Sequence, residues 1–149
     1  MDSNPLTQAI AATFAMDRYS TLIYHGVQSV YTANKMRGLP NCGRDWFINT
    51  RETLRKLGFK VYCPVELDEI FPSPFKDQES QEAWRFFMQR DIELILQAKP
   101  DAILLGPQWL DSIGANIEMT LAPVINAQVF VETEHGIHLV PQRSYHAAG

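Results

Sequence analysis

The 149-residue chain has only two cysteines, Cys42 and Cys63, which form no CxxC motif and lie near no other candidate zinc ligands. Neither a disulfide scaffold nor a structural metal is therefore expected. Basic residues are also few, since thirteen Lys and Arg stand against seventeen Asp and Glu, for a formal net charge of −4. Duplex nucleic acid is bound largely through basic surfaces that release counterions, so a nucleic-acid polymer is disfavoured as a partner.

Long apolar runs are missing as well. No window reaches the roughly eighteen apolar residues of a membrane span. The first residues, Met1 to Pro5, lack the basic and apolar regions of a secretory signal. We therefore expect a cytoplasmic protein without a membrane partner. GxGxxG and the Walker lysine motif are absent too, which disfavours nucleotide binding through those routes.

Apolar segments of strand type alternate with helical patterns along the chain. The expected strands cover residues 27–33, 59–63, 101–106 and 128–132, and the expected helices cover 44–57, 80–98 and about 111–126. This order predicts an α/β fold: a doubly wound, mostly parallel, flavodoxin-like sheet of four to five strands with helices on both faces. Such sheets bind ligands beyond the carboxyl ends of their strands.

Three regions are less regular. Residues 1–26 are predicted to form an N-terminal helical arm, with a peripheral helix and then a linker, and residues 133–149 a C-terminal tail or an edge hairpin. The segment 64–79 holds three prolines and five acidic residues without a period, which indicates an active-site loop or a mobile cover. Pro123 should end or kink the helix that contains it.

The longest helical pattern, residues 80–98, suggests which side chains face inward. We expect the inner side to carry Ala83, Trp84, Phe87, Ile92, Ile95 and Leu96. The helices around Trp46 and Trp84 are candidate contact faces for an oligomer. His135 and His138 have the spacing of a metal pair but no third ligand nearby, so no metal site is assigned.

Two loops follow the first and third expected strands and should meet at one crevice. The first loop, 34–41, contains Arg37 and Gly38, and the second, 107–114, ends with Ser112 and Gly114 before a helix. A fixed cation beside a flexible backbone and a helix N-terminus would suit a phosphate. The alternative is a plain turn followed by a serine helix cap.

Two carboxylates and a tyrosine are candidates for chemistry in the same crevice. Glu118 follows Ser112 by six residues, and Asp91 lies in the helix before the third strand. Paired carboxylates can break a glycosidic bond through a covalent sugar intermediate, and Tyr31 would add a phenol to the site. The alternatives are surface charges for the two acids and a core position for the tyrosine.

These residues stand in segments that resemble the nucleoside 2-deoxyribosyltransferase-like superfamily over about residues 27–132. The segments are Tyr31-Thr32-Ala33, Met36 to Asn41, Arg90-Asp91, Asp101 to Leu105, and Trp109 to Glu118 with its Ser-x-Gly-x-x-x-Glu pattern. The branch most similar to this chain is an uncharacterised set common in bacteriophage genomes, beside the 2′-deoxynucleoside 5′-monophosphate N-hydrolases.

The resemblance implies a role for each of these residues. Glu118 would attack the anomeric carbon, Asp91 would help to protonate the departing base, and Tyr31 would orient the nucleophile. The phosphate-contacting positions would be Arg37, Gly38, Ser112 and Gly114. Nucleoside transferases carry Asp six residues before the nucleophile and the monophosphate hydrolases carry Ser, so Ser112 favours a 5′-phosphate.

The expected function is therefore an N-glycosidase acting on a (deoxy)nucleoside 5′-monophosphate, without a metal or an organic cofactor. A nucleoside deoxyribosyltransferase and a noncatalytic nucleotide-binding or sequestering module remain the alternatives. A phage structural or interaction protein with a vestigial crevice is a third. Trp46, Phe47 and Trp109 are candidates for base stacking, and members of the superfamily are usually homodimers or larger.

Overall fold

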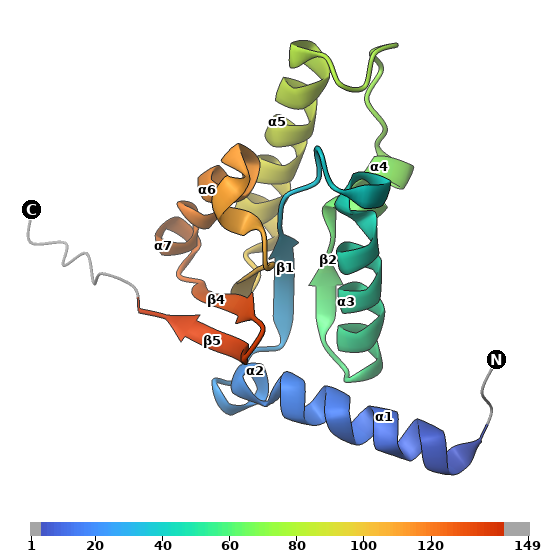
Figure 1. Ribbon diagram of the computed structural model, residues 1–149. Helices are drawn as coiled ribbons and strands as arrows, with labels where there is room; N and C mark the ends of the chain where they lie inside the picture. The colour runs from blue at the N-terminus through green and yellow to red at the C-terminus, as the bar shows by residue number, and fades with distance from the viewer. Residues whose placement is uncertain (1–3, 142–149) are drawn as a thin grey trace, which may run out of the picture.

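The computed structural model describes residues 4–141 and contains one five-stranded sheet (Figure 1). The strand order is β2-β1-β3-β4-β5. The strands are β1 (Ser29–Ala33), β2 (Lys60–Tyr62), β3 (Ala102–Leu105), β4 (Gln128–Thr133) and β5 (Gly136–Val140). Neighbours among β1 to β4 are parallel, whereas β5 runs antiparallel to β4. The predicted α/β class and the mostly parallel sheet are confirmed.

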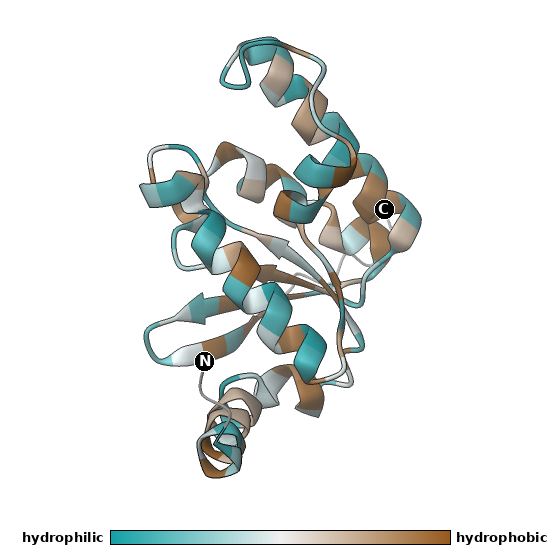
Figure 2. Ribbon diagram, turned by 90° about the vertical axis from the view of Figure 1, so that its right-hand side faces the viewer, coloured by the Kyte–Doolittle hydropathy of each residue, from teal (hydrophilic) through white to brown (hydrophobic). Residues whose placement is uncertain are grey.

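Helices cover both faces of this sheet because its central strands are apolar on both sides. On one face, α2 (Ser20–Tyr24) and α3 (Arg44–Lys56) contribute Leu22 and Leu54 to a core with Leu104 and Phe130. On the other face lie α5 (Gln81–Ala98), α6 (Ile113–Met119) and α7 (Ala122–Ile125). Figure 2 shows the mostly brown central strands between the two helical layers.

The strand order determines where a crevice opens. From β1 the chain passes to β2 on one side and then returns across β1 to β3 on the other side. Right-handed crossovers in opposite directions place α3 on one face and α5 on the other. The loops that follow β1 and β3 therefore separate, and ligands of doubly wound sheets bind in the crevice between them.

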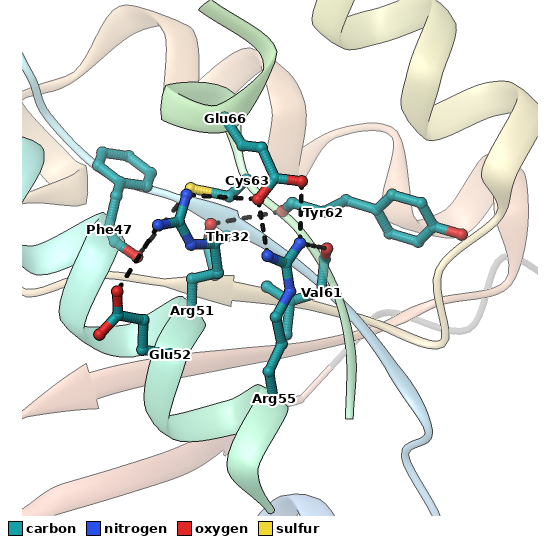
Figure 3. A network of polar contacts seen from close by, with 9 residues as sticks. All are labelled: Thr32, Phe47, Arg51, Glu52, Arg55, Val61, Tyr62, Cys63 and Glu66. Atoms are coloured by element: carbon teal, nitrogen blue, oxygen red, sulfur yellow. Dashed lines mark hydrogen bonds and ion pairs between the residues drawn. The ribbon is translucent and has the colours of Figure 1, made fainter. Parts of the chain in front are cut away.

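The segment 64–79 is more ordered than its composition indicates. Pro64–Ile70 form the helix α4, with Pro64 in its first turn, where a missing amide hydrogen is tolerated. Glu66 on α4 accepts hydrogen bonds from Arg51 and Arg55 of α3, at 3.3 Å and 2.7 Å (Figure 3). Arg55 also donates to the carbonyl oxygen of Val61, at 3.0 Å. These contacts are distant in sequence, so the composition of the segment alone could not predict the helix.

The N-terminal arm contains two helices rather than a helix and a linker. The helix α1 (Pro5–Arg18) buries no residue, in keeping with the peripheral helix predicted there. In α2, by contrast, Leu22 is fully buried in the core, together with the adjoining Tyr19. The predicted linker is therefore wrong, because the segment docks on the sheet through these two side chains.

Other expectations about single elements have mixed outcomes. The expected helix 111–126 is divided into α6 and α7, and Pro123 lies in the first turn of α7, so the predicted interruption is confirmed. In the C-terminal region, the described residues form the predicted edge hairpin, with β4 and β5 as its strands, and residues 142–149 of that region lie outside the described residues. The inward assignment of Leu96 is wrong: its side chain is exposed, because the inner side of α5 is formed by Ala83, Met88, Asp91 and Ile95. None of the helices within residues 4–141 is long and apolar enough to cross a lipid bilayer.

Candidate active site

A cavity of about 470 Å³ lies in the crevice at the carboxyl ends of β1 and β3. Its wall combines the loop after β1, the start of α4, the N-terminal half of α5 and the first turns of α6. The loop after β1 and the loop after β3 are connected by Asn34 and Gln108. The side-chain carbonyl of Asn34 accepts from the Gln108 backbone N–H at 2.9 Å, and its amide donates to the Gln108 side chain at 3.0 Å.

Glu118 lines this cavity, and Tyr31 is bonded to it from the sheet. Tyr31 is in β1, and its side chain lies on the sheet face covered by α5 and α6. Glu118 is in α6 and only 5% exposed. The Tyr31 hydroxyl donates a short hydrogen bond to Oε2 of Glu118. The structure thus brings together two of the three predicted catalytic residues.

Asp91, the third, lies on the inner side of α5 and is 6% exposed, so it is not a surface charge. Arg90 donates to Asp91 Oδ1 at 2.9 Å and pairs with Asp68 Oδ1 of α4, also at 2.9 Å. Arg90 also donates to the carbonyl oxygens of Phe71 and Pro64, at 3.1 Å and 3.4 Å. It therefore joins α4, the segment after it and the Asp91 carboxylate.

Burial raises the pKa of both buried carboxyl groups. Desolvation raises the pKa of Asp91 to about 6, although the neighbouring Arg90 acts in the opposite direction. Desolvation and then the charge of Asp91 raise the pKa of Glu118 well above its ordinary value, against the Tyr31 hydrogen bond and Arg90. Burial likewise raises the pKa of the Tyr31 hydroxyl, which stays protonated. Two charges in this space are unfavourable, so the pair holds one proton near neutral pH.

Three basic side chains line the open side of the cavity: Lys35, Arg37 and Arg44. Arg37 is exposed and donates to the carbonyl oxygen of Glu79, at 3.2 Å. Within residues 4–141, none of the three has a carboxylate within ion-pair distance. Their charges are thus available to an anion in a protein whose net charge is negative.

The other predicted phosphate positions have clear structural roles. Ser112 lines the cavity and caps α6, its hydroxyl accepting from the Ala115 N–H at 3.1 Å. Gly114 also lines the cavity, and a Cβ there would lie 3.0 Å from Met88 Sδ, so glycine lets α6 approach α5 closely. Gly38 has a φ of +80° and is outside the cavity wall. Glycine at this position allows the positive φ of the turn and does not bring the backbone close to the cavity.

Aromatic side chains from two helices line the cavity, namely Phe47 of α3 with Trp84 and Phe87 of α5. Two of the tryptophans considered for base stacking lie elsewhere. Trp109 packs against the core beneath α6, and Trp46 donates from Nε1 to Glu132 at 2.8 Å. Trp84, whose helix was considered above as an oligomer contact face, is part of the cavity wall.

Sequence reasoning missed Arg90 and Asp68 as members of the site. Arg90 directly precedes Asp91 in the sequence, and this adjacency was a weak indication that Arg90 belongs to the site. Asp68 had none, because its helix was not predicted. In the part of the chain that the structure describes, no group of three or more His, Cys, Asp or Glu side chains is arranged to hold a metal ion.

Comparison with protein families gives one assignment. Residues 28–131, more than half of the chain, match the family described as Domain of unknown function (DUF4406). The chain belongs to the DUF4406 family. The matched segment begins at the start of β1 and ends within β4, so it contains every cavity residue named above and excludes α1 and α2. Comparison with curated proteins gives no match.

Proposed function

We propose that this member of the DUF4406 family is an N-glycosidase that cleaves the base–sugar bond of a nucleoside 5′-monophosphate. The observation that carries the proposal is the buried pair Asp91 and Glu118, which both line one cavity, with Tyr31 bonded to Glu118. Isolated buried carboxyl groups are costly, and two of them facing one cavity are typical of acid–base and nucleophilic sites.

The chemistry proposed for the pair is a double displacement. A Glu118 carboxylate oxygen bonds to the anomeric carbon as the carbon–nitrogen bond to the base breaks, and the base takes a proton from Asp91. Water then attacks the same carbon, gives its proton to Asp91 and releases Glu118. The products are a free base and a sugar 5′-phosphate. Transfer to a second base is the same sequence with a base nitrogen in place of water.

The reaction needs an ionised Glu118 and a protonated Asp91. In the structure burial and the charge of Asp91 favour the proton on Glu118, because the pKa of Glu118 is raised well above its ordinary value while that of Asp91 is about 6, so this proton must pass to Asp91 when the substrate binds. The Tyr31 hydrogen bond favours the ionised form of Glu118. Arg90 favours the ionised form of Asp91, which the base requires once its proton has been given away.

The rest of the cavity supports a nucleotide as the ligand. The basic side chains Lys35, Arg37 and Arg44 offer charge to a phosphate, and Trp84 and Phe87 offer faces to a base. A resemblance to the nucleoside 2-deoxyribosyltransferase-like superfamily, on the motifs given above, supports the same ligand class. Ser112 in place of Asp favours the phosphorylated substrate within that superfamily.

The test is direct. Purified protein is incubated with the common ribo- and 2′-deoxynucleoside 5′-monophosphates, and the released base is quantified by chromatography. We expect release from at least one nucleotide and none with Glu118→Gln, which keeps the shape of the side chain but removes the nucleophile. Full turnover by Glu118→Gln would disprove the covalent route. Binding without release by the wild type would identify a nucleotide-binding module instead.

A further inference from the structure

The helix α1 is held away from the rest of the protein. It lies below the amino-terminal ends of β1 and β2 in Figure 1 and at the bottom of the molecule in Figure 2, and none of its residues is buried. Its carboxyl end is firmly attached: Arg18 pairs with the buried Glu132 at 3.1 Å, and the next residue, Tyr19, is part of the core. The helix is therefore an anchored arm whose length is surrounded by solvent.

One side of this arm is an apolar stripe. Leu6, Ile10 and Phe14 follow one another at four-residue intervals, so they lie along one side of the helix. Leu6 is 68% and Phe14 is 70% exposed. Thr13, beside the stripe, bonds the Ala9 carbonyl oxygen at 2.9 Å and so needs no water. A helix of 14 residues is marginal in water on its own, and this one gains no stability from packing on its own domain.

We propose that the stripe of Leu6, Ile10 and Phe14 pairs with the same stripe of a second copy of this chain, with the two α1 helices antiparallel. The stripe suits its own copy because residues 5–16 contain no charged side chain, so no like charges oppose each other across a twofold axis. A partner of different sequence would meet no charged group on the stripe that could select it.

The charges at the helix ends favour the antiparallel arrangement. The first turn of α1 contains no acidic residue, while Asp17 lies near the carboxyl end, where its own helix dipole is unfavourable to it. In an antiparallel pair, Asp17 of each chain lies beside the amino end of the other helix, where negative charge is favoured. A parallel pair would place the two Asp17 side chains together.

This interface is independent of the proposed chemistry, since α1 lies outside both the cavity wall and the segment 28–131. A helix of 14 residues is about 21 Å long, so one helix pair covers less than the roughly 800 Å² per partner of a standard interface. The expected dimer is therefore weak and depends on protein concentration.

Sedimentation velocity over a wide concentration range tests the pairing. We expect a reversible monomer–dimer equilibrium in the wild type and a dimer weakened by about tenfold or more in Ile10→Asp/Phe14→Asp, since charge in the stripe must be buried on pairing. The matched control is Val124→Asp on α7, which changes a 70% exposed apolar residue outside the stripe. A wild type that stays monomeric throughout, or equal weakening by the control, would overturn the proposal.

Charge exchange tests the orientation. Asp17→Lys should weaken the dimer because it places a positive charge beside the amino end of the facing helix. Thr7→Glu should weaken it because the new carboxylate faces Asp17 of the other chain. The double variant should restore it. Failure of the double variant to restore the dimer would rule out the antiparallel pair. Circular dichroism of every variant confirms that the chain is folded, which the absence of buried residues in α1 leads us to expect.

Discussion

At the scale of single residues, the main feature of this protein is the cost of keeping Glu118 and Asp91 away from water. Both carboxyl groups are buried, and the pKa of each is raised chiefly by desolvation. Their ionisation therefore opposes folding. A site that retains such groups lowers the stability of the fold in exchange for their reactivity. This loss of stability can be measured without knowledge of the substrate.

The stability of Glu118→Gln relative to wild type should increase as the pH rises. In the folded state Glu118 keeps its proton at pH values above the ordinary carboxyl pKa of 4.5. Its protonated form therefore contributes its full stabilisation below that pH, and this contribution is lost as the pH rises through the higher folded pKa. Glutamine never ionises and avoids this loss. We expect the free energy of unfolding of the variant, relative to wild type, to increase by about 1 kcal/mol or more between pH 5 and pH 8.

Urea unfolding at both pH values measures this difference. The matched control is Glu93→Gln, an exposed glutamate on α5, for which the difference should be small and constant. A difference that does not vary with pH in Glu118→Gln would mean that Glu118 is solvated in solution.

Arg37→Ala tests whether the open side of the cavity holds a phosphate. Arg37 has an exposed guanidinium without a carboxylate partner in the described part of the chain, so a phosphate would gain a charge-assisted hydrogen bond from it. The variant should lose about 2 to 3 kcal/mol in kcat/KM toward the nucleoside monophosphate and little toward the matching nucleoside. Lys76→Ala, exposed but outside the cavity wall, is the control. Equal losses on both substrates would remove Arg37 from the phosphate site.

At the scale of elements, the sequence predicted the parts of the fold that depend on local pattern. Apolar strands, the Gly58 stop after α3 and the interruption at Pro123 are readable because one short segment determines each of them. The helix α4 was missed, since its contacts come from Arg51 and Arg55 of another helix. The local sequence pattern contains no information about such distant partners.

The site was predictable to a similar extent. The paired carboxylates and the superfamily motifs pointed to Tyr31, Asp91 and Glu118, and the structure brings these three together. Which aromatic residues line the cavity was not predictable, because Trp84 and Trp109 occupy equally apolar surroundings in the sequence. Their difference depends on how α5 and α6 cross the sheet.

The two glycines beside the cavity should differ in how they tolerate alanine. A Cβ at Gly106 would lie 2.4 Å from Asn34 Cγ, at the contact that connects the ends of β1 and β3. A Cβ at Gly114 would lie 3.0 Å from the flexible Met88 side chain, and alanine there gains helix propensity. We expect Gly106→Ala to cost about 1 to 3 kcal/mol of stability and Gly114→Ala distinctly less, by urea unfolding. The reverse order would show that Asn34 yields more easily than α6.

At the scale of the whole molecule, the chain combines the segment that matches the family with an arm outside that segment. The domain, residues 28–131, holds the candidate site, and α1 with α2 lies outside it. The two parts are nevertheless one structure, because Tyr19 and Leu22 lie in the same core as β3 and β4. A polar link between them is Glu132 of β4, which is 5% exposed and binds both Trp46 Nε1 and Arg18.

Arg18→Ala should therefore destabilise the whole fold rather than release the arm alone. Without Arg18, the buried Glu132 carboxylate keeps the Trp46 hydrogen bond as its remaining side-chain partner within residues 4–141. Because the Arg18 side chain is 47% exposed, water replaces part of the loss, and we expect a cost of about 1 to 2 kcal/mol rather than that of a fully buried pair. In the Glu132→Gln background the same change should cost almost nothing, since no charge is left unpaired. Urea unfolding followed by tryptophan fluorescence gives all four free energies of this double-mutant cycle. Equal losses in both backgrounds would place the effect of Arg18 in its own helix, and the arm would then be joined to the domain by Tyr19 and Leu22 alone.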